Sequence, residues 1–236
     1  MEEPEAEVQE EAAAEAEPAE ESEAQAEAAV GPEAVEETDT QAAAEAETSE
    51  EIATTLVIYE IVPAESEARF LIDEVLRGDP ITVVGTTDQV AGQIAVDFSD
   101  PQASQVGTIQ INARTLATDN DFRNRAIKNA ILLTDNYEFV TFTPTEITGL
   151  PENATVGESY NFQIVGDLTV TDTTQQVTFD VTATATSETQ LQGTASTSVL
   201  YTDFGLFIPD APAVDTVDDA VRLEIDFVAD AISATS

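Results

Sequence analysis

Apolar and polar residues alternate with a period of two along most of the second part of the chain. Tyr160, Phe162 and Ile164 share one parity, whereas Asn161 and Gln163 share the other. Successive side chains of a strand point to opposite faces, so this alternation predicts a half-buried β-strand. The segments that we expect to be strands are residues 56–62, 68–76, 81–98 with a break near 85–88, 106–113, 138–149, 160–171, 177–185, 191–201 and 221–229.

One segment between these strands shows helical spacing instead. Residues 119–121 (Asp-Asn-Asp) are residue types that cap helix N-termini, and apolar residues then recur at spacings of three and four up to Thr134. Consecutive strands with one inserted helix predict an all-β fold, in which an antiparallel sheet closes into a barrel or forms a sandwich. A barrel of about eight strands has an interior that side chains fill or that holds one slender ligand.

The distribution of charge separates an N-terminal region from the rest of the chain. Residues 1–51 contain 20 acidic residues, no basic residue and no apolar stripe. Burial cannot compensate the entropy of ordering such a segment, so we expect residues 1–51 to be a disordered, Glu/Ala-rich acidic tail or linker. Its role is that of a spacer, a partner-binding arm or a solvating segment. Residues 52–236 hold all ten Phe and all seven basic residues, and we expect them to form one folded domain.

Composition excludes several classes of chemistry. The chain has no His and no Cys, so imidazole bases, thiol nucleophiles and disulfides are absent. A net charge of −41 disfavours nucleic acid as a partner. We find no apolar run of roughly 18 residues that would predict a transmembrane segment, and no pattern of oxygen ligands that predicts a metal site. The sequence therefore indicates a protein that is not an enzyme, and it leaves the oligomeric state open, a dimer included.

A colinear series of short motifs resembles the YceI-like family of lipid- or polyisoprenoid-binding proteins. The resemblance extends from about Leu56 to Ile232, which is essentially the whole predicted domain. The motifs are Tyr59-Glu-Ile61, Ser66-x-x-Arg69-Phe70, Gly85, Gly92-x-Ile94, Leu116-x-Thr118-Asp119, Arg123-Asn124, Ile131-Leu132, Phe139-Val-Thr-Phe142, Gly166-Asp-Leu168-Thr-Val170, Val177-Thr-Phe179, Gly193, Asp203-Phe204-Gly205, Pro209 and Val217-x-x-x-Val221-x-Leu223-x-Ile225-x-Phe227.

The resemblance implies an extended, lipocalin-like antiparallel β-barrel of about eight strands with one inserted α-helix. It also implies non-catalytic binding, sequestration or transport of an elongated apolar molecule in the barrel lumen. The ligand would be a polyisoprenoid, an isoprenoid quinone or a related lipid, with no other cofactor. Relatives are periplasmic, secreted or at the cell surface, although Met1-Glu2-Glu3 does not resemble the start of a signal peptide. Many members carry His-Leu after the start of the helix, where this chain has Arg125-Ala126.

Strand parity predicts which residues face the interior of such a barrel. Either these side chains fill the core, or they line a lumen for an isoprenoid or acyl chain. In the first case the protein is a structural or interaction module of the cell envelope with no small ligand. The lumen candidates are Phe70, Ile72, Ile94, Ile109, Ile111, Phe142, Phe162, Ile164, Phe179, Leu191 and Phe227.

A second group of residues is a candidate for the mouth of the lumen. Phe204, Leu206 and Phe207 lie beside Gly205 and Pro209, where no regular strand would hide them, and they are expected to line a lid or mouth. Arg123 and Arg125 belong to a cluster of basic residues in an acidic chain. A guanidinium matches the oxygens of a phosphate or polar headgroup, so these two arginines contact a headgroup or instead pair with Asp119 and Asp121.

Overall fold

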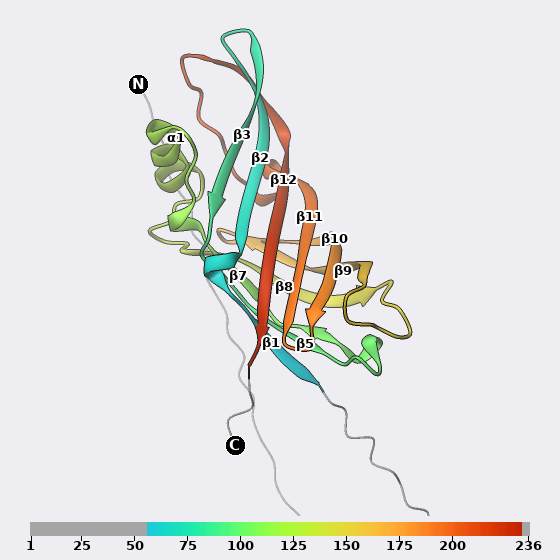
Figure 1. Cartoon of the computed structure of the whole chain (residues 1–236). Coiled ribbons are helices and arrows are strands. Elements are labelled where there is room, and N and C mark those ends of the chain that lie inside the picture. The colour runs from blue at the N-terminus through green and yellow to red at the C-terminus, as the bar shows by residue number, and fades with distance from the viewer. Residues whose placement is uncertain (1–55, 233–236) are drawn as a thin grey trace, which may run out of the picture. The chain divides into compact units, whose positions relative to one another are not determined.

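The computed structural model describes residues 56–232, and in this part of the chain the strands form one antiparallel sheet that curls into a barrel (Figure 1). The tail expected over residues 1–51 lies outside the described residues. The strands are β1 Val57–Ile61, β2 Glu67–Leu76, β3 Asp79–Thr87, β4 Val90–Ala91, β5 Gln93–Val96, β6 Gln105–Val106, β7 Ile109–Asn112, β8 Phe139–Thr148, β9 Ser159–Val170, β10 Thr173–Ser187, β11 Gln190–Leu200 and β12 Val214–Ala231. The helical elements are η1 Pro63–Glu65, η2 Pro101–Ala103, η3 Ala113–Thr115, α1 Asp121–Ala126, η4 Ile127–Ile131 and η5 Tyr201–Phe204.

The hydrogen-bonded path of the sheet begins at β4 and ends at β6. It runs in the order β4-β7-β8-β9-β10-β11-β12-β1-β5-β6. Strand β4 lies at one end of this path and β5 lies next to the other end. The single residue Gly92 joins β4 to β5, and its carbonyl accepts a hydrogen bond from the amide of Ile61 at 3.0 Å. This link brings the two ends of the path together, and the curled antiparallel sheet confirms the barrel that the sequence predicts.

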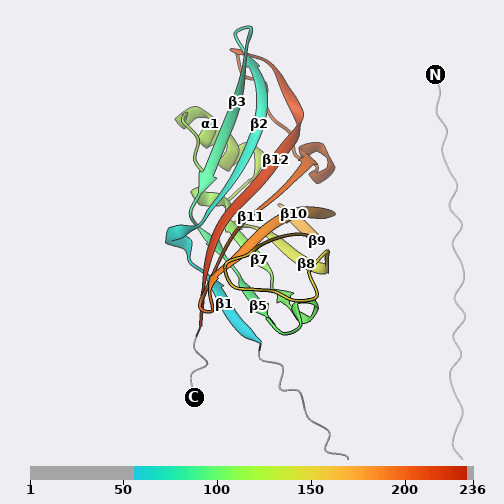
Figure 2. The ribbon, with the colours of Figure 1, turned by 45° about the vertical axis from the view of Figure 1, so that its right-hand side comes forward.

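The longest strand, β12, joins two parts of the barrel wall. Its C-terminal end pairs with β1 and its N-terminal part pairs with β2, which pairs in turn with β3. The β2–β3 hairpin and the first part of β12 therefore extend the wall beyond the other strands, beside α1, as both views show (Figures 1 and 2). We call this the α1 end of the barrel, and the region around β1 and β5 the β1 end.

The inserted helix is short and ends in a wider turn. The side chain of Asn120 accepts hydrogen bonds from the backbone amides of Phe122 and Arg123, so Asn120 is the N-cap of α1. After Ala126 the helix continues as one π-helical turn, η4, to Ile131. The helical region is therefore that expected from the sequence, and it ends three residues before Thr134.

Several boundaries differ from those expected. Strand β3 continues through most of the break expected at residues 85–88, and the strand expected at 106–113 is divided into β6 and β7. The turn between β9 and β10 consists only of Thr171 and Asp172, with Thr171 at a φ of 56°, whereas the expected strands ended at residue 171 and resumed at residue 177. Strand β12 begins at Val214, seven residues earlier than the alternation indicates, because it pairs with β2 through irregular register between Val217 and Val221. A bulge interrupts the strict alternation of apolar and polar residues, so the alternation did not predict the part of β12 before residue 221.

An ion-pair network across β2 and β12 makes stability depend on pH. Arg69 Nε lies 2.6 Å from Glu224 Oε2, and this hydrogen bond holds the pKa of Glu224 below its ordinary value of 4.5. A carboxylate with a lowered folded pKa stabilises the fold above its unfolded pKa, and this contribution is lost as the pH falls through the folded pKa. Glu224→Gln should therefore lower the free energy of unfolding by about 1 kcal/mol at neutral pH.

Urea denaturation at pH 7 and at a series of acidic pH values measures this effect. The difference between Glu224→Gln and the parent should shrink below about pH 4.5, where the parent carboxylate begins to lose its advantage. Glu67→Gln is the matched control, because Glu67 is more exposed and lies 3.4 Å from Arg69. A difference that stays constant across the acidic range would contradict the assignment to Glu224 ionisation.

Candidate ligand-binding site

The interior of the barrel contains a cavity of about 240 Å³ toward the β1 end, which we call cavity 1. Its walls are residues of strands on all sides of the barrel, together with residues of the loops at 98–104 and 150–155. Ten of the eleven lumen candidates line it. They are Phe70, Ile94, Ile109, Ile111, Phe142, Phe162, Ile164, Phe179, Leu191 and Phe227.

A second cavity of about 200 Å³, cavity 2, lies at the α1 end. It is lined by α1 and η4 on one side and by η5 with the following loop on another, together with β2 and β12. Among the candidates, Ile72 lines this cavity, and so do Arg123, Phe204 and Leu206.

Two mouth candidates lie outside both cavities. Phe207 is 71% exposed and lines neither cavity, although its neighbours Leu206 and Ile208 line cavity 2. Arg125 is exposed, and its guanidinium carbon lies 4.6 Å from the centre of the Phe122 ring. A cation placed over an aromatic face at this distance is stabilised by the ring, so Arg125 already has a partner within its own helix.

The two cavities adjoin each other. Four residues line both of them, namely Phe70, Leu116, Val140 and Leu223. Each cavity alone is smaller than the roughly 300 to 1,000 Å³ that is usual for small-molecule sites, but together they fall within that range. A ligand that occupies both has to pass between these four side chains. The shape of the interior therefore suits a long, narrow molecule.

Glycines on the cavity wall leave room for aromatic rings. A Cβ atom at Gly85 would overlap the ring of Phe70, which lies directly opposite on β2. In the same way, a Cβ atom at Gly193 would lie 2.8 Å from the ring of Phe227 on β12. The absence of a Cβ atom at these glycines lets the two rings lie close to the neighbouring strand, which leaves more space at the centre of the barrel.

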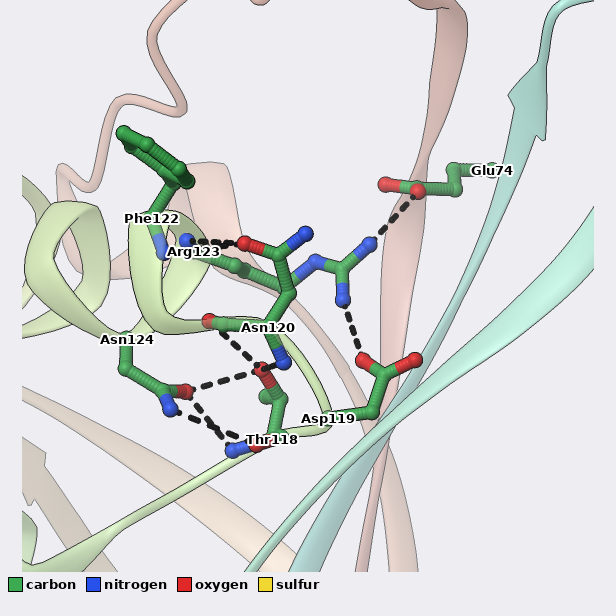
Figure 3. A network of polar contacts seen from close by, with 7 residues as sticks. All are labelled: Glu74, Thr118, Asp119, Asn120, Phe122, Arg123 and Asn124. Carbon is green, nitrogen blue, oxygen red and sulfur yellow. Dashed lines mark hydrogen bonds and ion pairs between the residues drawn. The ribbon is translucent and has the colours of Figure 1, made fainter.

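The polar end of cavity 2 is formed by an arginine and a buried glutamate. Arg123 donates a hydrogen bond to Glu74 across 3.0 Å, and Glu74 is 8% exposed (Figure 3). A second terminal nitrogen of Arg123 donates to Asp119 at 2.7 Å. The loop before α1 is held by Asn124, whose side-chain oxygen accepts hydrogen bonds from the amide and hydroxyl of Thr118 (Figure 3).

Tyr201 of η5 also lines cavity 2. Desolvation and the negative charge of Asp219 raise the pKa of Tyr201, so its hydroxyl is protonated at neutral pH. The polar residues that line cavity 2 thus include the Arg123–Glu74 ion pair and Tyr201. Arg123 can hold a polar group by hydrogen bonding, whereas most other residues that line the two cavities are apolar, with Arg69 and Glu224 of cavity 1 among the exceptions.

Sequence reasoning missed Glu74 and several apolar residues around the junction of the cavities. Glu74 shares its strand parity with Phe70 and Ile72, so an acidic residue at an inward position was the signal that could have found it. Leu116 lies outside any strand, in the segment that leads to α1, and alternation gives no information there.

Residues 56–232 contain neither a membrane-spanning helix nor a cluster of metal-binding side chains. None of the helical segments in this range has the length and hydropathy needed to cross a bilayer. No cluster of three or more acidic side chains in the same range is placed to hold a metal ion.

An antiparallel sheet that curls around two adjoining and mostly apolar cavities defines a barrel of the lipocalin-like type. Residues 59–229 match the YceI-like domain, and the chain belongs to this family. No curated protein matches the sequence.

Solved structures share the fold at low sequence identity. A polyisoprenoid-binding domain from Saccharophagus degradans, implicated in plant cell wall breakdown, aligns with a TM-score of 0.59 and 14% identity over 75% of this chain and 99% of that domain. Burkholderia cenocepacia BcnA aligns with a TM-score of 0.56 and 17% identity over 71% and 98% of the two chains. The Campylobacter jejuni YceI protein aligns with a TM-score of 0.52 and 14% identity over 64% and 85%. These likenesses show a common fold.

Proposed function

We propose that this protein binds an elongated apolar molecule, a polyisoprenoid, an isoprenoid quinone or a related lipid, inside the barrel and sequesters or transports it without covalent chemistry. The observation that carries the proposal is the pair of adjoining cavities, whose shared lining is apolar and whose combined length runs along the barrel. Apolar burial contributes about 25 cal/mol per Å² of area removed from water, so a long hydrocarbon chain gains affinity along its whole length.

Membership of the YceI-like family supports this proposal, because this family suggests a function in lipid or isoprenoid binding. The Saccharophagus degradans domain of the same fold is described as polyisoprenoid-binding. The lumen residues predicted from strand parity would contact the chain of the ligand, and Arg123, Phe204 and Leu206 would lie near one end of it.

Native mass spectrometry of protein purified from its own host tests the proposal. We expect a population heavier than the polypeptide by the mass of an isoprenoid or long-chain lipid, and this mass should be released by organic extraction. A clean apo mass, together with no uptake of added isoprenoid, would favour the alternative, a structural or interaction module of the cell envelope with no small ligand.

We also propose a periplasmic, extracellular or cell-surface location. Members of the YceI-like family are typically periplasmic, and this supports the assignment. Fractionation of native cells followed by immunodetection tests it, and protein found only in the cytosol would overturn it.

A further inference from the structure

Two acidic side chains are buried within residues 56–232, and they have different surroundings. Asp97 accepts hydrogen bonds from the backbone amides of Ser99 and Asp100, which accounts for its burial in a loop. Glu74 instead lines cavity 2, on the same face of β2 as Phe70 and Ile72. A buried carboxylate is costly unless it is paired, so a charged residue at this position of an apolar lumen needs an explanation.

The charge of Arg123 is already balanced by carboxylates. Its two terminal nitrogens donate to Glu74 and Asp119, at 3.0 and 2.7 Å, and its side chain is 22% exposed (Figure 3). These three side chains together carry one net negative charge. A guanidinium has five N–H donors, so two ion pairs leave donors that can reach an oxygen atom of a ligand.

The surroundings of this cluster add no compensating positive charge to the wall of cavity 2. Arg123 is the basic residue that lines it, and the hydroxyl of Tyr201 is a neutral donor and acceptor beside Asp219. The described part of the chain has 28 acidic and 7 basic residues. A phosphate bound to the remaining N–H groups of Arg123 would lie close to the buried carboxylate of Glu74, which is 3.0 Å from Arg123.

We propose that the Glu74–Arg123 end of cavity 2 receives the head of the ligand and selects an uncharged, hydrogen-bonding head over an anionic one. This inference rests on the proposed function, and it names the ligand class of that site. Remaining N–H groups of Arg123 bond an alcohol or quinone oxygen without disturbing the ion pair. The carboxylate of Glu74 repels a phosphate or a carboxylate in the same place.

A matched pair of ligands tests the selection. Geranylgeraniol and geranylgeranyl monophosphate have the same chain and differ in their heads, and each is titrated as a competitor against a fluorescent isoprenoid bound to the full chain. We expect the parent to bind the alcohol about tenfold more tightly than the phosphate. Glu74→Gln removes the opposing charge and keeps the shape, so it should raise affinity for the phosphate by about tenfold and change affinity for the alcohol much less.

Asp73→Asn is the matched control. It removes one negative charge from the adjacent position of β2, but Asp73 is exposed and contacts Thr82 rather than the cavity. It should leave the ratio of the two affinities unchanged. This comparison separates the local effect of Glu74 from the effect of net charge.

The affinities of the parent and of the two variants decide whether the head of the ligand is selected at this end of cavity 2. Equal affinities of the parent for the two ligands, or tighter binding of the phosphate, would overturn head selection and leave the proposed function intact. A ratio shifted equally by Glu74→Gln and Asp73→Asn would overturn the role of Glu74. If the folded parent binds neither ligand nor the fluorescent isoprenoid, both the head selection and the proposed function are wrong. The comparison of ligands on the parent needs no variant, so an unstable Glu74→Gln protein does not prevent the decision.

Discussion

Replacement of Ile164 by tryptophan is expected to reduce uptake of a fluorescent isoprenoid by about tenfold or more while the barrel stays folded. Ile164 is buried in β9 and lines cavity 1, so the larger side chain enters space that the ligand would occupy. Overpacking usually costs about 1–3 kcal/mol, and an empty cavity of about 240 Å³ should keep the loss at the lower end of this range.

Equilibrium titration with the fluorescent isoprenoid and thermal denaturation together measure this result. Gln163→Trp is the matched control, because Gln163 is the adjacent residue on β9 and is exposed on the outer face. It should bind as the parent does. Binding by the parent should also persist in high salt, since apolar burial is not screened by ions. A variant at Ile164 that unfolds, with a parent that takes up no isoprenoid, would mean that the interior is ordinary core.

Replacement of Gly85 by alanine is expected to obstruct the junction of the two cavities. The obstacle to a Cβ atom at this position is the Phe70 ring, which lines both cavities. The ring must therefore turn away from β3 into the lumen. Affinity for an isoprenoid alcohol long enough to occupy both cavities should fall by about tenfold, whereas affinity for farnesol, which one cavity suffices to hold, should change by about twofold or less.

Combining Gly85→Ala with Phe70→Leu should restore binding of the long alcohol, because the smaller side chain leaves room for the new methyl group. Gly193→Ala is the contrasting variant. Its Cβ atom would overlap the backbone carbonyl oxygen of Thr182 as well as approach Phe227. A backbone carbonyl in a paired strand cannot move away from the new methyl group as an aromatic ring can. Gly193→Ala should therefore lower the free energy of unfolding by about 2 kcal/mol. Phe227→Leu should not recover this loss.

Denaturation curves and affinities for the two alcohols check these expectations. An unchanged ratio of long-chain to short-chain affinity in Gly85→Ala would show that Phe70 does not control the junction. Failure of Phe70→Leu to restore binding would show that the effect of Gly85 arises elsewhere in the wall.

Strand alternation predicted most of the wall and the direction of its side chains. In β9, Tyr160, Phe162 and Ile164 share the apolar parity, and all three line cavity 1. A pleated strand has only two faces, and its polar face is the one exposed to water. Alternation fails where the backbone is irregular. The first part of β12 pairs through a bulge, and the segment with Leu116 is not a strand, so neither was visible in the pattern.

The candidate head end could be predicted only in part. The helix that carries Arg123 follows from capping chemistry and spacing, and pairing with Asp119 was one of the expected alternatives. The pairing with Glu74 was not, because the two residues are 49 positions apart and belong to different elements. The two cavities and their junction could not be predicted either, because the alternation pattern describes each strand separately and does not show how strands face one another.

The amino-acid sequence by itself determined the all-β class, the inserted helix, the parity of each regular strand and the strongly negative charge, because these depend on residue types and on local spacing. Tertiary structure alone decided whether the inward side chains fill the barrel or leave it hollow. That outcome depends on which residue faces which across neighbouring strands, as when Gly85 lies opposite Phe70 and Gly193 opposite Phe227. Rings that lie over glycines stay at the wall, and the unfilled centre is a property of these pairs rather than of any one residue.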